Sequence, residues 1–411
     1  MKIIVLAGGN DQAALMQELR RKIEGVEIIL IDFAPNVVAA KFADRHIVES
    51  TMDLHKVKEI AVREKVDYIM TACGDQPLLT MAVVSEELGL HCYLSKKQVL
   101  SLTNKMYMKR LMVENEISTS RFKTFTSKER LNVDGLTFPL VVKPVDSNGS
   151  KGVRKVNDMA ELERYAKEAF MFSLTDTIIV EEFCEGDEIS ADFYVVDGKA
   201  VKVMWCQLNK YKVDENTQVI YQSVIPPSLS AVATQRLTEI ANKIVKAYQV
   251  DNSPLLIQLM VNGDDVKVIE FSARLGGGAK YKTIQNVTGF NVLRANLESM
   301  LGERPDVKIN DDGRYYSRCH LYVEGGIFTA VEGLEYLQQN RIIDEYVLTK
   351  PFGVEVGSPK SSSDRVASVF ISAATREDLE SKIKKAINNI KVLDEKGDDM
   401  LFRGIYNSIR K

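Results

Sequence analysis

Residues 140–153 read LVVKPVDSNGSKGV, an apolar strand that ends in Lys143 and runs into a loop rich in glycine, serine and lysine. Small residues let backbone N–H groups approach an anion closely, and Lys143 and Lys151 add positive charge beside them. This composition suits a polyphosphate. An ordinary surface hairpin is the alternative for the stretch taken alone, and two later segments decide between them.

The first of these segments, residues 178–188, reads IIVEEFCEGDE, a strand that leaves the core and becomes an acidic connector. An adenine ring needs a flat apolar slot with one backbone donor and one acceptor, which residues 182–184 can supply. Glu188, just beyond them, is placed to accept hydrogen bonds from two ribose hydroxyls. A solvated acidic loop is the simpler interpretation of this segment alone.

The second segment, residues 268–278, reads VIEFSARLGGG. Side chains alternate along a strand, so Glu270, Ser272 and Arg274 share one face. With Gln258 from the partner strand of a predicted hairpin, they form an all-oxygen set suited to Mg²⁺, and Arg274 offers a bidentate donor for an oxyanion. A cross-strand ion pair between Glu270 and Arg274 is the structural alternative, but it leaves the three glycines unexplained.

Residues 3–103 alternate strand and helix, which is typical of a parallel sheet. The Gly-Gly turn after the first strand lacks the third glycine of a dinucleotide motif, so a tight strand-to-helix turn is favoured over NAD binding. Ligands of such sheets lie at the carboxyl ends of the strands. Asp75 is therefore a candidate contact for a substrate amine, with a helix N-cap as an equal alternative. A short strand around Tyr93 is predicted to complete this part.

Composition indicates the number of domains, the kinds of partner and the location of the protein. The chain has 411 residues, 45% of them hydrophobic and 27% charged, with a net charge of −3. Two to four domains are expected at this length, and the near-neutral balance predicts no nucleic-acid partner. Five scattered cysteines without a Cys-x-x-Cys pair indicate reduced thiols and a cytoplasmic location. No apolar run approaches membrane-spanning length, so no membrane partner is predicted.

The order of a helix lysine, a strand lysine with a glycine loop, a Glu-x-x-Cys linker and a Glu-Phe-Ser-Ala-Arg strand resembles the ATP-grasp superfamily. The resemblance implies an α/β and α+β chain with a three-lobed, biotin carboxylase-like architecture. Residues 1–103 would form a Rossmann-like domain. Residues 104–308 would form the two-lobed ATP-grasp fold, with a mobile lobe at about 125–205, and residues 309–411 a small α+β lobe.

The same resemblance assigns roles to individual residues. Arg274 and Lys143 would be catalytic, with Arg274 acting on an acyl phosphate. The ATP contacts would be Lys105, Lys143, Ser147, Gly149, Ser150, Lys151, Gly152, Glu181, Glu182, Phe183, Cys184 and Glu188. The metal ligands would be Gln258, Glu270 and Ser272. The substrate contacts would be Asp75, Gly276, Gly277, Gly278 and Lys280.

Two positions depart from the family pattern. Ser272 replaces an asparagine, and Gln258 replaces an acidic metal ligand. Both remain oxygen ligands, so ATP with Mg²⁺ is expected, with Mn²⁺ as the alternative metal, although the lost negative charge should weaken one metal site. A further phosphate lysine of the family corresponds to Lys210 or Lys212, and the sequence does not choose between them.

The resemblance implies an ATP-dependent carboxylate–amine ligase that forms an amide or peptide bond through an acyl phosphate. Its substrates would be an amino acid or another small carboxylate together with an amine, and ADP and phosphate would be released. The stretch from Glu270 to Gly278 looks more like amino-acid and peptide-forming ligases than purine-pathway members. Another ATP-grasp reaction, of purine-pathway or carboxylase type, and a non-catalytic ATP-binding protein are the alternatives. A homodimer is common among proteins that it resembles.

Overall fold

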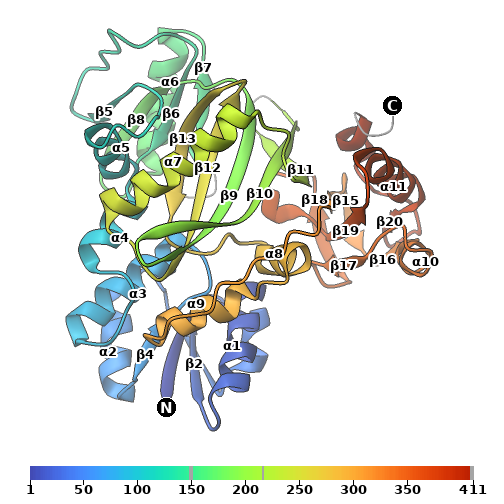
Figure 1. Ribbon diagram of the computed structural model, residues 1–411, viewed down its shortest axis with the longest axis horizontal. Helices are drawn as coiled ribbons and strands as arrows, with labels where there is room; N and C mark the ends of the chain where they lie inside the picture. Colours follow the sequence, from blue (N-terminus) through green and yellow to red (C-terminus); the bar gives the residue numbers. More distant parts are fainter. Residues whose placement is uncertain (148–150, 215–216, 408–411) are drawn as a thin grey trace. The chain divides into compact units, whose positions relative to one another are not determined.

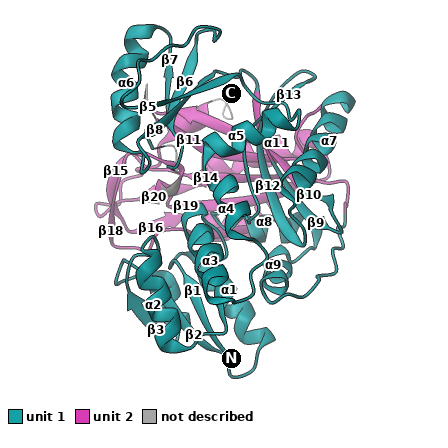
Figure 2. Ribbon diagram, turned by 90° about the vertical axis from the view of Figure 1, so that its left-hand side faces the viewer, with its two compact units in different colours: residues 1–186, 191–203, 230–310 teal, residues 187–190, 204–229, 311–411 magenta. Residues whose placement is uncertain are grey.

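The computed structural model describes residues 1–147, 151–214 and 217–407, and the chain divides into two compact units, coloured separately in Figure 2. Unit 1 comprises Met1–Gly186, Ala191–Val203 and Ser230–Asn310, and unit 2 comprises Asp187–Ser190, Met204–Leu229 and Asp311–Lys411. The predicted boundaries after residues 103 and 308 stay predictions. Within the described part of the chain, no helix combines the length and apolarity needed to cross a membrane.

Unit 1 begins with a parallel sheet of strand order β3-β2-β1-β4. Strands β1, β2 and β4 have buried apolar residues, as expected for a parallel sheet covered by crossover helices, whereas the edge strand β3 has no buried residue. The predicted parallel arrangement is therefore confirmed. The elements in chain order are β1 (Lys2–Leu6), α1 (Asn10–Lys22), β2 (Glu27–Asp32), the 3₁₀ helix η1 (Val38–Phe42), β3 (Arg45–Val48), α2 (Leu54–Glu64), β4 (Tyr68–Met70) and α3 (Asp75–Leu88).

The predicted strand at Tyr93 is wrong. Residues 90–95 are irregular, and the Tyr93 hydroxyl donates a hydrogen bond to the carbonyl oxygen of Ala273 at 3.0 Å. The three residues Cys92–Leu94 are apolar enough for a strand, but none of them pairs with the β3-β2-β1-β4 sheet, in which β4 is the last strand. The short helix α4 (Lys96–Thr103) follows at once, opened by a capping box at Ser95.

A second, antiparallel sheet of order β5-β8-β6-β7 carries the lysine strand. Its elements are β5 (Phe122–Thr126), β6 (Leu140–Pro144), β7 (Arg154–Val156), α6 (Met159–Met171) and β8 (Thr177–Glu182). One face is apolar, with Leu140, Val142 and Val180 in a core shared with α6 (Figure 1). Because side chains alternate along a strand, Lys143 and Glu181 lie on the opposite face.

The remaining strands of unit 1 have the order β13-β12-β9. The hairpin of β12 (Ser253–Asn262) and β13 (Asp265–Ser272) turns at Gly263, whose φ of +57° suits glycine, and this agrees with the predicted Asn-Gly turn. The strands β9 (Asp187–Val196) and β10 (Lys199–Lys212) have residues in both units. The helices of this part are α5 (Lys105–Glu114), α7 (Ala231–Tyr248), α8 (Lys280–Thr288) and α9 (Val292–Met300).

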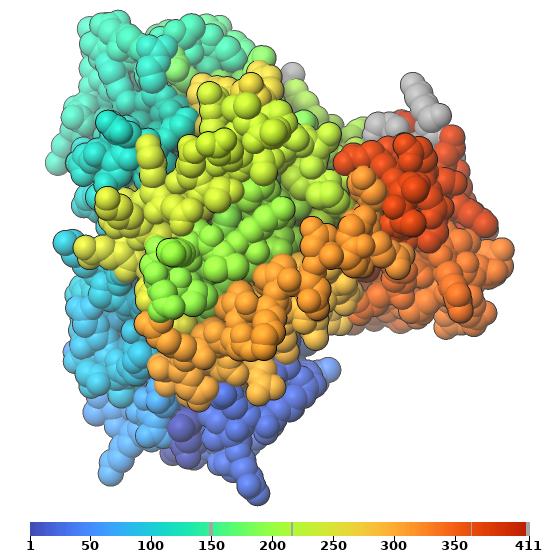
Figure 3. Space-filling view, viewed as in Figure 1, coloured from blue at the N-terminus to red at the C-terminus, as the bar shows by residue number. Residues whose placement is uncertain are grey.

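Residues 301–310 close unit 1 along its surface, where Figure 3 shows them in orange beside the green β9–β10 turn. Arg304 forms ion pairs with Asp197 of that turn and with Asp251, the latter at 3.5 Å. Asn252 donates to the carbonyl oxygen of Glu303 at 2.7 Å. Exposed pairs of this kind contribute little to stability.

Unit 2 has the strand order β10-β11-β14-β19-β17 around an apolar core, with small two-stranded sheets beside it. The predicted α+β character of the C-terminal part is confirmed. The elements are β11 (Gln218–Ile225), β14 (Tyr315–Leu321), β15 (Gly325–Phe328), β16 (Ala330–Glu332), α10 (Leu334–Gln339), β17 (Glu345–Leu348), β18 (Val354–Gly357), η2 (Ser362–Asp364), β19 (Ala367–Ala373), α11 (Arg376–Asn389), β20 (Lys391–Leu393) and η3 (Arg403–Tyr406).

Candidate active site

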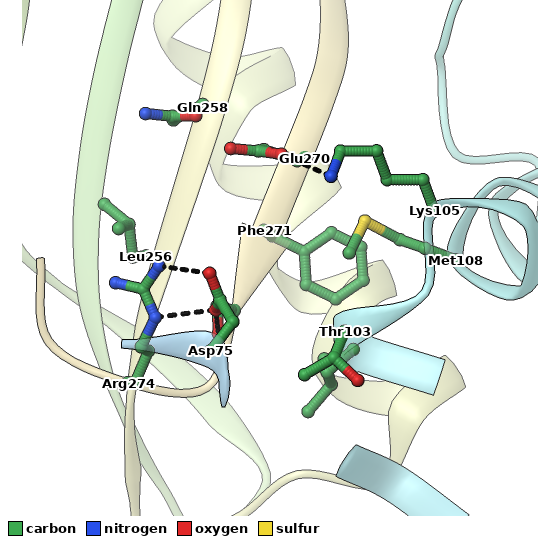
Figure 4. A pocket seen from close by; sticks show the side chains of 11 residues that line it. Asp75, Thr103, Lys105, Met108, Leu256, Gln258, Glu270, Phe271 and Arg274 are labelled. Atoms are coloured by element: carbon green, nitrogen blue, oxygen red, sulfur yellow. Dashed lines mark hydrogen bonds and ion pairs between the residues drawn. The ribbon is translucent and has the colours of Figure 1, made fainter. Parts of the chain in front are cut away.

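A pocket in unit 1 brings together six of the predicted site residues from segments far apart in the sequence (Figure 4). They are Asp75, Lys105, Gln258, Glu270, Ser272 and Arg274. The sequence reasoning missed the apolar and hydroxyl residues that complete the lining, namely Leu102, Thr103, Met108, Leu256 and Phe271. Periodicity marks most of these as ordinary core positions, so no local signal distinguishes them.

The oxygen ligands predicted for a metal lie on neighbouring strands. Gln258 of β12 and Glu270 of β13 are direct cross-strand partners, and Figure 4 shows both side chains in the pocket. Lys105 Nζ lies 3.9 Å from Glu270 Oε2, and the Glu270 side chain remains 42% exposed. Among the described residues no group of three or more His, Cys, Asp or Glu side chains could hold a metal by itself. The donor set fits a Mg²⁺ ion that takes further oxygens from phosphates and water.

Arg274 is held by Asp75 in a bidentate pair. Arg274 Nε donates to Asp75 Oδ1 at 2.7 Å and Nη2 donates to Oδ2 at 2.8 Å, while Ser272 Oγ donates to Oδ1 at 3.0 Å. Burial raises the pKa of Asp75, but Arg274 and Ser272 outweigh it, so the net pKa is lowered. Burial lowers the pKa of Arg274, and Asp75 outweighs it and raises the net pKa. Both groups are therefore ionised at neutral pH.

The N-cap alternative for Asp75 is wrong. Gly74 is the N-cap of α3, and its φ of +97° is a conformation that favours glycine. Asp75 is the first helical residue, and its carboxylate is turned to Arg274 rather than to the helix N–H groups. Its predicted contact with a substrate amine stays a prediction.

Lys143 and Glu181 belong to a buried ionic cluster that also contains Lys109 of α5. Lys143 Nζ pairs with Glu181 Oε1, and Lys109 Nζ lies 2.7 Å from Glu181 Oε2. Ser120 Oγ donates to the same Oε2 at 3.0 Å. Burial raises the pKa of Glu181, but the two lysines outweigh it and hold the net pKa well below the usual range. Lys109 was missed because a helical lysine is usually solvated, and nothing local marks it as buried.

The glycine loop is described only in part. Ser147 accepts a hydrogen bond from Lys105 Nζ at its carbonyl oxygen, at 2.8 Å, and Lys151 is exposed. Gly152 has a φ of +68°, and a Cβ there would lie 3.0 Å from the Phe172 ring, so the position requires glycine. The predicted contacts Gly149 and Ser150 lie outside the described residues.

The predicted adenine segment follows β8. Glu182 is paired with Arg121, and the Phe183 ring lies 3.9 Å from Lys155 Nζ. Cys184 is half-buried, and burial raises the pKa of its thiol. Glu188 falls in unit 2, where its carboxylate pairs with Lys210. Of the two candidate lysines, Lys210 is the one that pairs with Glu188. The role of either lysine in binding phosphate stays a prediction.

The predicted substrate segment already has internal partners. Gly278 N and Ala279 N donate to the Asp11 carboxylate at 3.2 and 3.0 Å. Lys280 Nζ lies 2.6 Å from Asp192 Oδ2. A Cβ on Gly276 would lie 2.7 Å from the Lys280 side chain, which would have to shift, and a Cβ on Gly277 would meet the Cys73 Sγ at an ordinary 3.8 Å.

Asp11 and Asp192 are the residues that the sequence reasoning missed at this segment. Asp11 lies in the predicted turn after β1, so its position at a carboxyl edge was a usable signal. Asp192 sits inside β9 without any such mark.

Two family models match the chain. Residues 103–278 match the ATP-grasp (A) domain of phosphoribosylglycinamide synthetase, and residues 320–393 match the C-terminal domain 2 of L-amino acid ligase. A phosphoribosylamine–glycine ligase of Caldanaerobacter subterraneus subsp. tengcongensis is 30% identical over 296 residues, which cover 67% of this chain and 69% of that protein.

The chain belongs to the ATP-grasp superfamily. The recognition of this superfamily, of its fold and of an ATP-grasp ligase is thereby confirmed. A formate-dependent phosphoribosylglycinamide formyltransferase of Parabacteroides distasonis is 27% identical over 279 residues, covering 66% of this chain and 69% of that protein.

Solved structures agree on the fold of this ATP-grasp ligase. The L-amino acid ligase of Bacillus licheniformis aligns with a TM-score of 0.78 at 20% identity, over 96% of this chain and 98% of that chain. The phosphoribosylglycinamide synthetase of Anaerococcus prevotii aligns with a TM-score of 0.75 at 18% identity, over 96% and 99%. At these identities the likeness shows the fold alone.

Proposed function

We propose that this ATP-grasp ligase joins a small carboxylate, such as an amino acid, to an amine. ATP would activate the carboxylate as an acyl phosphate, and the products would be an amide, ADP and phosphate. The observation that carries the proposal is the pocket in which Arg274, held ionised by Asp75, lies with Glu270, Gln258 and Lys105.

The assignment of ATP follows from the charges around that pocket. Lys105 and Lys143 would contact phosphates, and Ser147, Lys151 and Gly152, with Gly149 and Ser150, would form the flap over them. Residues Glu181–Cys184 would hold the adenine, with Phe183 as its apolar surface, and Glu188 the ribose. The Lys155 ammonium that now covers Phe183 would have to move aside.

Glu270, Gln258 and Ser272 would hold Mg²⁺, with Mn²⁺ as the alternative. The ion would neutralise the negative charge of the phosphates, and the Glu270 carboxylate would hold the ion. One solved neighbour, the biotin carboxylase domain of the Hydrogenobacter thermophilus 2-oxoglutarate carboxylase, is in complex with MgADP, which supports the pairing of nucleotide and metal.

The chemistry needs no side-chain nucleophile. A carboxylate oxygen of the substrate would attack the γ-phosphorus, and the bond to the ADP oxygen would break. The amine nitrogen would then attack the acyl carbon, phosphate would leave, and the amine would lose a proton. Arg274 is placed to stabilise the oxyanion that forms during this attack, so it and Lys143 would be the catalytic groups.

Both sets of relatives support this substrate class. The name of the phosphoribosylamine–glycine ligase pairs an amine with an amino acid, and the name of the L-amino acid ligase states an amino acid as its substrate. The match of residues 320–393 to an L-amino acid ligase domain favours an amino-acid carboxylate. The contacts would come from Asp75, Gly276, Gly277, Gly278 and Lys280. A purine-pathway reaction is the second candidate, favoured by the matches over the ATP-grasp region.

Three predictions about the setting complete the proposal. The protein would act in the cytoplasm, without nucleic acid or membrane, and would form a homodimer. In support of the last, one solved neighbour, the biotin carboxylase domain of the Hydrogenobacter thermophilus 2-oxoglutarate carboxylase, is a dimer.

The test is ADP release by the purified protein with Mg²⁺-ATP and a panel of amino acids and small carboxylates, singly and in pairs, with glycine plus a phosphoribosylamine included. Release that requires a carboxylate and an amine is expected. Release with the glycine and phosphoribosylamine pair alone would move the assignment to the second candidate. ATP binding without release in any mixture would overturn both in favour of a non-catalytic protein.

A further inference from the structure

Glu181 has two lysine partners that differ in their other contacts. Lys109 Nζ donates to Glu181 Oε2 at 2.7 Å, to Thr119 Oγ1 at 2.5 Å and to Ser120 Oγ at 3.1 Å. These three acceptors use all three ammonium hydrogens. Among the described residues, Lys143 donates to Glu181 Oε1 and to no other acceptor. Lys109 is therefore fixed, whereas Lys143 has hydrogens left for another partner.

The two lysines also differ in where they lie. Lys109 is 1% exposed, inside the cluster formed by α5, β8 and residues 119–120. Lys143 ends β6 beside the glycine loop and is close enough to Glu270 for that carboxylate to raise its pKa. Burial lowers the pKa of both lysines. At Lys109 burial outweighs the nearby carboxylate, so the net pKa is lowered. At Lys143 the carboxylates of Glu181 and Glu270 outweigh burial, so the net pKa is raised. Lys143 thus stands between a buried carboxylate and the pocket.

We propose that Lys109 is a positioning residue that keeps Glu181 neutralised when Lys143 turns to the phosphates of a nucleotide. The inference rests on the proposed function, because it needs a phosphate-bearing ligand at Lys143. It concerns a residue that the sequence motifs do not include.

The physical reason is the cost of leaving a buried charge without a partner. Glu181 is 5% exposed, so without Lys109 its carboxylate would depend on Lys143 alone. A phosphate would then have to compete for Lys143 against a buried, unshared carboxylate. With Lys109 and Ser120 in place, Glu181 keeps a cation and a hydroxyl donor after Lys143 leaves. Lys109 therefore lowers the cost of moving Lys143.

The experiment measures ADP and adenosine affinities by calorimetry for the wild type and Lys109→Met. Lys143 would act through the phosphates, so ADP affinity is expected to fall about tenfold to a hundredfold, the range for hydrogen bonds to charged groups, while adenosine affinity stays unchanged. Lys97→Met, at an exposed lysine of α4, is the control and should change neither affinity.

Lys109→Arg separates positioning from structural damage. It keeps a cation beside Glu181, so ADP affinity should stay at about the wild-type value. If Lys109→Met cannot be purified in folded form, Lys109→Gln, which keeps a hydrogen-bond donor but not the charge, takes its place and should lose ADP affinity while adenosine affinity stays unchanged.

Three results would overturn the inference. One is wild-type ADP affinity in Lys109→Met, and another is an equal loss of ADP and adenosine affinity in that variant. The third is a Lys109→Arg variant that still binds adenosine but has lost ADP affinity. A wild type that binds no ADP at all would instead overturn the proposed function, and the inference with it.

Discussion

Two groups of charges in unit 1 differ in how completely they are neutralised. In the cluster of Lys109, Lys143 and Glu181, every side chain is at most 7% exposed and the carboxylate has a donor on each oxygen. In the pocket, Glu270 is 42% exposed, and its nearest cation, Lys105, lies 3.9 Å away. The Glu181 carboxylate is fully paired, whereas the Glu270 carboxylate in the pocket is available to bind a metal or a ligand.

This difference separates two uses of a glutamate on a strand. A buried carboxylate with short donors fixes the elements around it, since removing one partner leaves an uncompensated buried charge. A partly exposed carboxylate with one distant cation contributes little to stability and remains free to bind a metal or ligand. The same substitution, Glu→Gln, should therefore have opposite consequences at the two positions.

Glu270→Gln should abolish ligase activity while leaving the fold intact. The change removes the single carboxylate of the predicted metal set, and a loss of roughly a hundredfold to a thousandfold in kcat is expected for a preorganised electrostatic contact. Steady-state ADP release measures the loss, and thermal unfolding should show a Tm close to that of the wild type. Full activity in this variant would contradict the placement of the metal.

Glu181→Gln should instead lower stability. It leaves Lys109 and Lys143 facing each other without their carboxylate, and breaking a buried pair from one side costs about 3–5 kcal/mol. Urea unfolding of both variants gives the direct contrast. If Glu181→Gln were no less stable than Glu270→Gln, the cluster would not hold the structure together.

The contrast has a pH dependence whose sign follows from the pKa of Glu181. Its pKa is lowered in the folded protein, so its contribution to stability is present above its unfolded pKa of roughly 4.3 and is lost as the pH falls below that value. The stability gap between the wild type and Glu181→Gln should narrow as the pH falls from about 5. Unfolding series at several pH values check this, and a constant gap would contradict the assignment.

Much of the fold was predictable because its signals are local. Strand–helix alternation predicted the parallel sheet, and the Asn-Gly turn predicted the β12–β13 hairpin. Alternation along β13 predicted Glu270 and Ser272 on one face, and Arg274 follows just beyond the end of that strand. The predicted strand around Tyr93 is wrong because an apolar run forms a strand only beside a partner strand. The sequence of the run does not show whether such a partner is present.

The sequence indicated several residues that line the pocket, but it did not indicate which residues pair with one another. Asp75 was singled out from the sequence and lines the pocket, yet its partner Arg274 lies 199 positions later in the chain, and no local pattern links them. Lys109 looked like a surface lysine because only tertiary packing of α5 buries it. The fold decides which charged residues pair when they are far apart in the chain. The sequence therefore indicates candidate functional residues better than it indicates the residues that position them.

Asp75→Asn sharpens the contrast inside the pocket. Arg274 would keep its place but lose its charged bidentate partner, so kcat should fall about tenfold, the loss expected for one weakened charged contact, with ADP affinity unchanged. Kinetics with each substrate varied in turn measure this. An unchanged kcat with a raised KM for the amine alone would show instead that Asp75 contacts the amine, as the sequence first suggested.

Gln258→Glu should have the smallest effect and shows what the missing carboxylate does. Gln258 and Glu270 are direct cross-strand partners, so a second carboxylate places like charges opposite each other. Without metal the variant should lose up to about 1 kcal/mol of stability, the range for a cross-strand pair. Mg²⁺ should reverse this loss, because a divalent cation binds two facing carboxylates more tightly than one carboxylate and an amide. Thermal unfolding with and without Mg²⁺ measures both effects. If the Tm of the variant responds to Mg²⁺ no more than that of the wild type, the metal lies away from these two strands. The chemical role of the pocket would then depend on Arg274 and Asp75 alone.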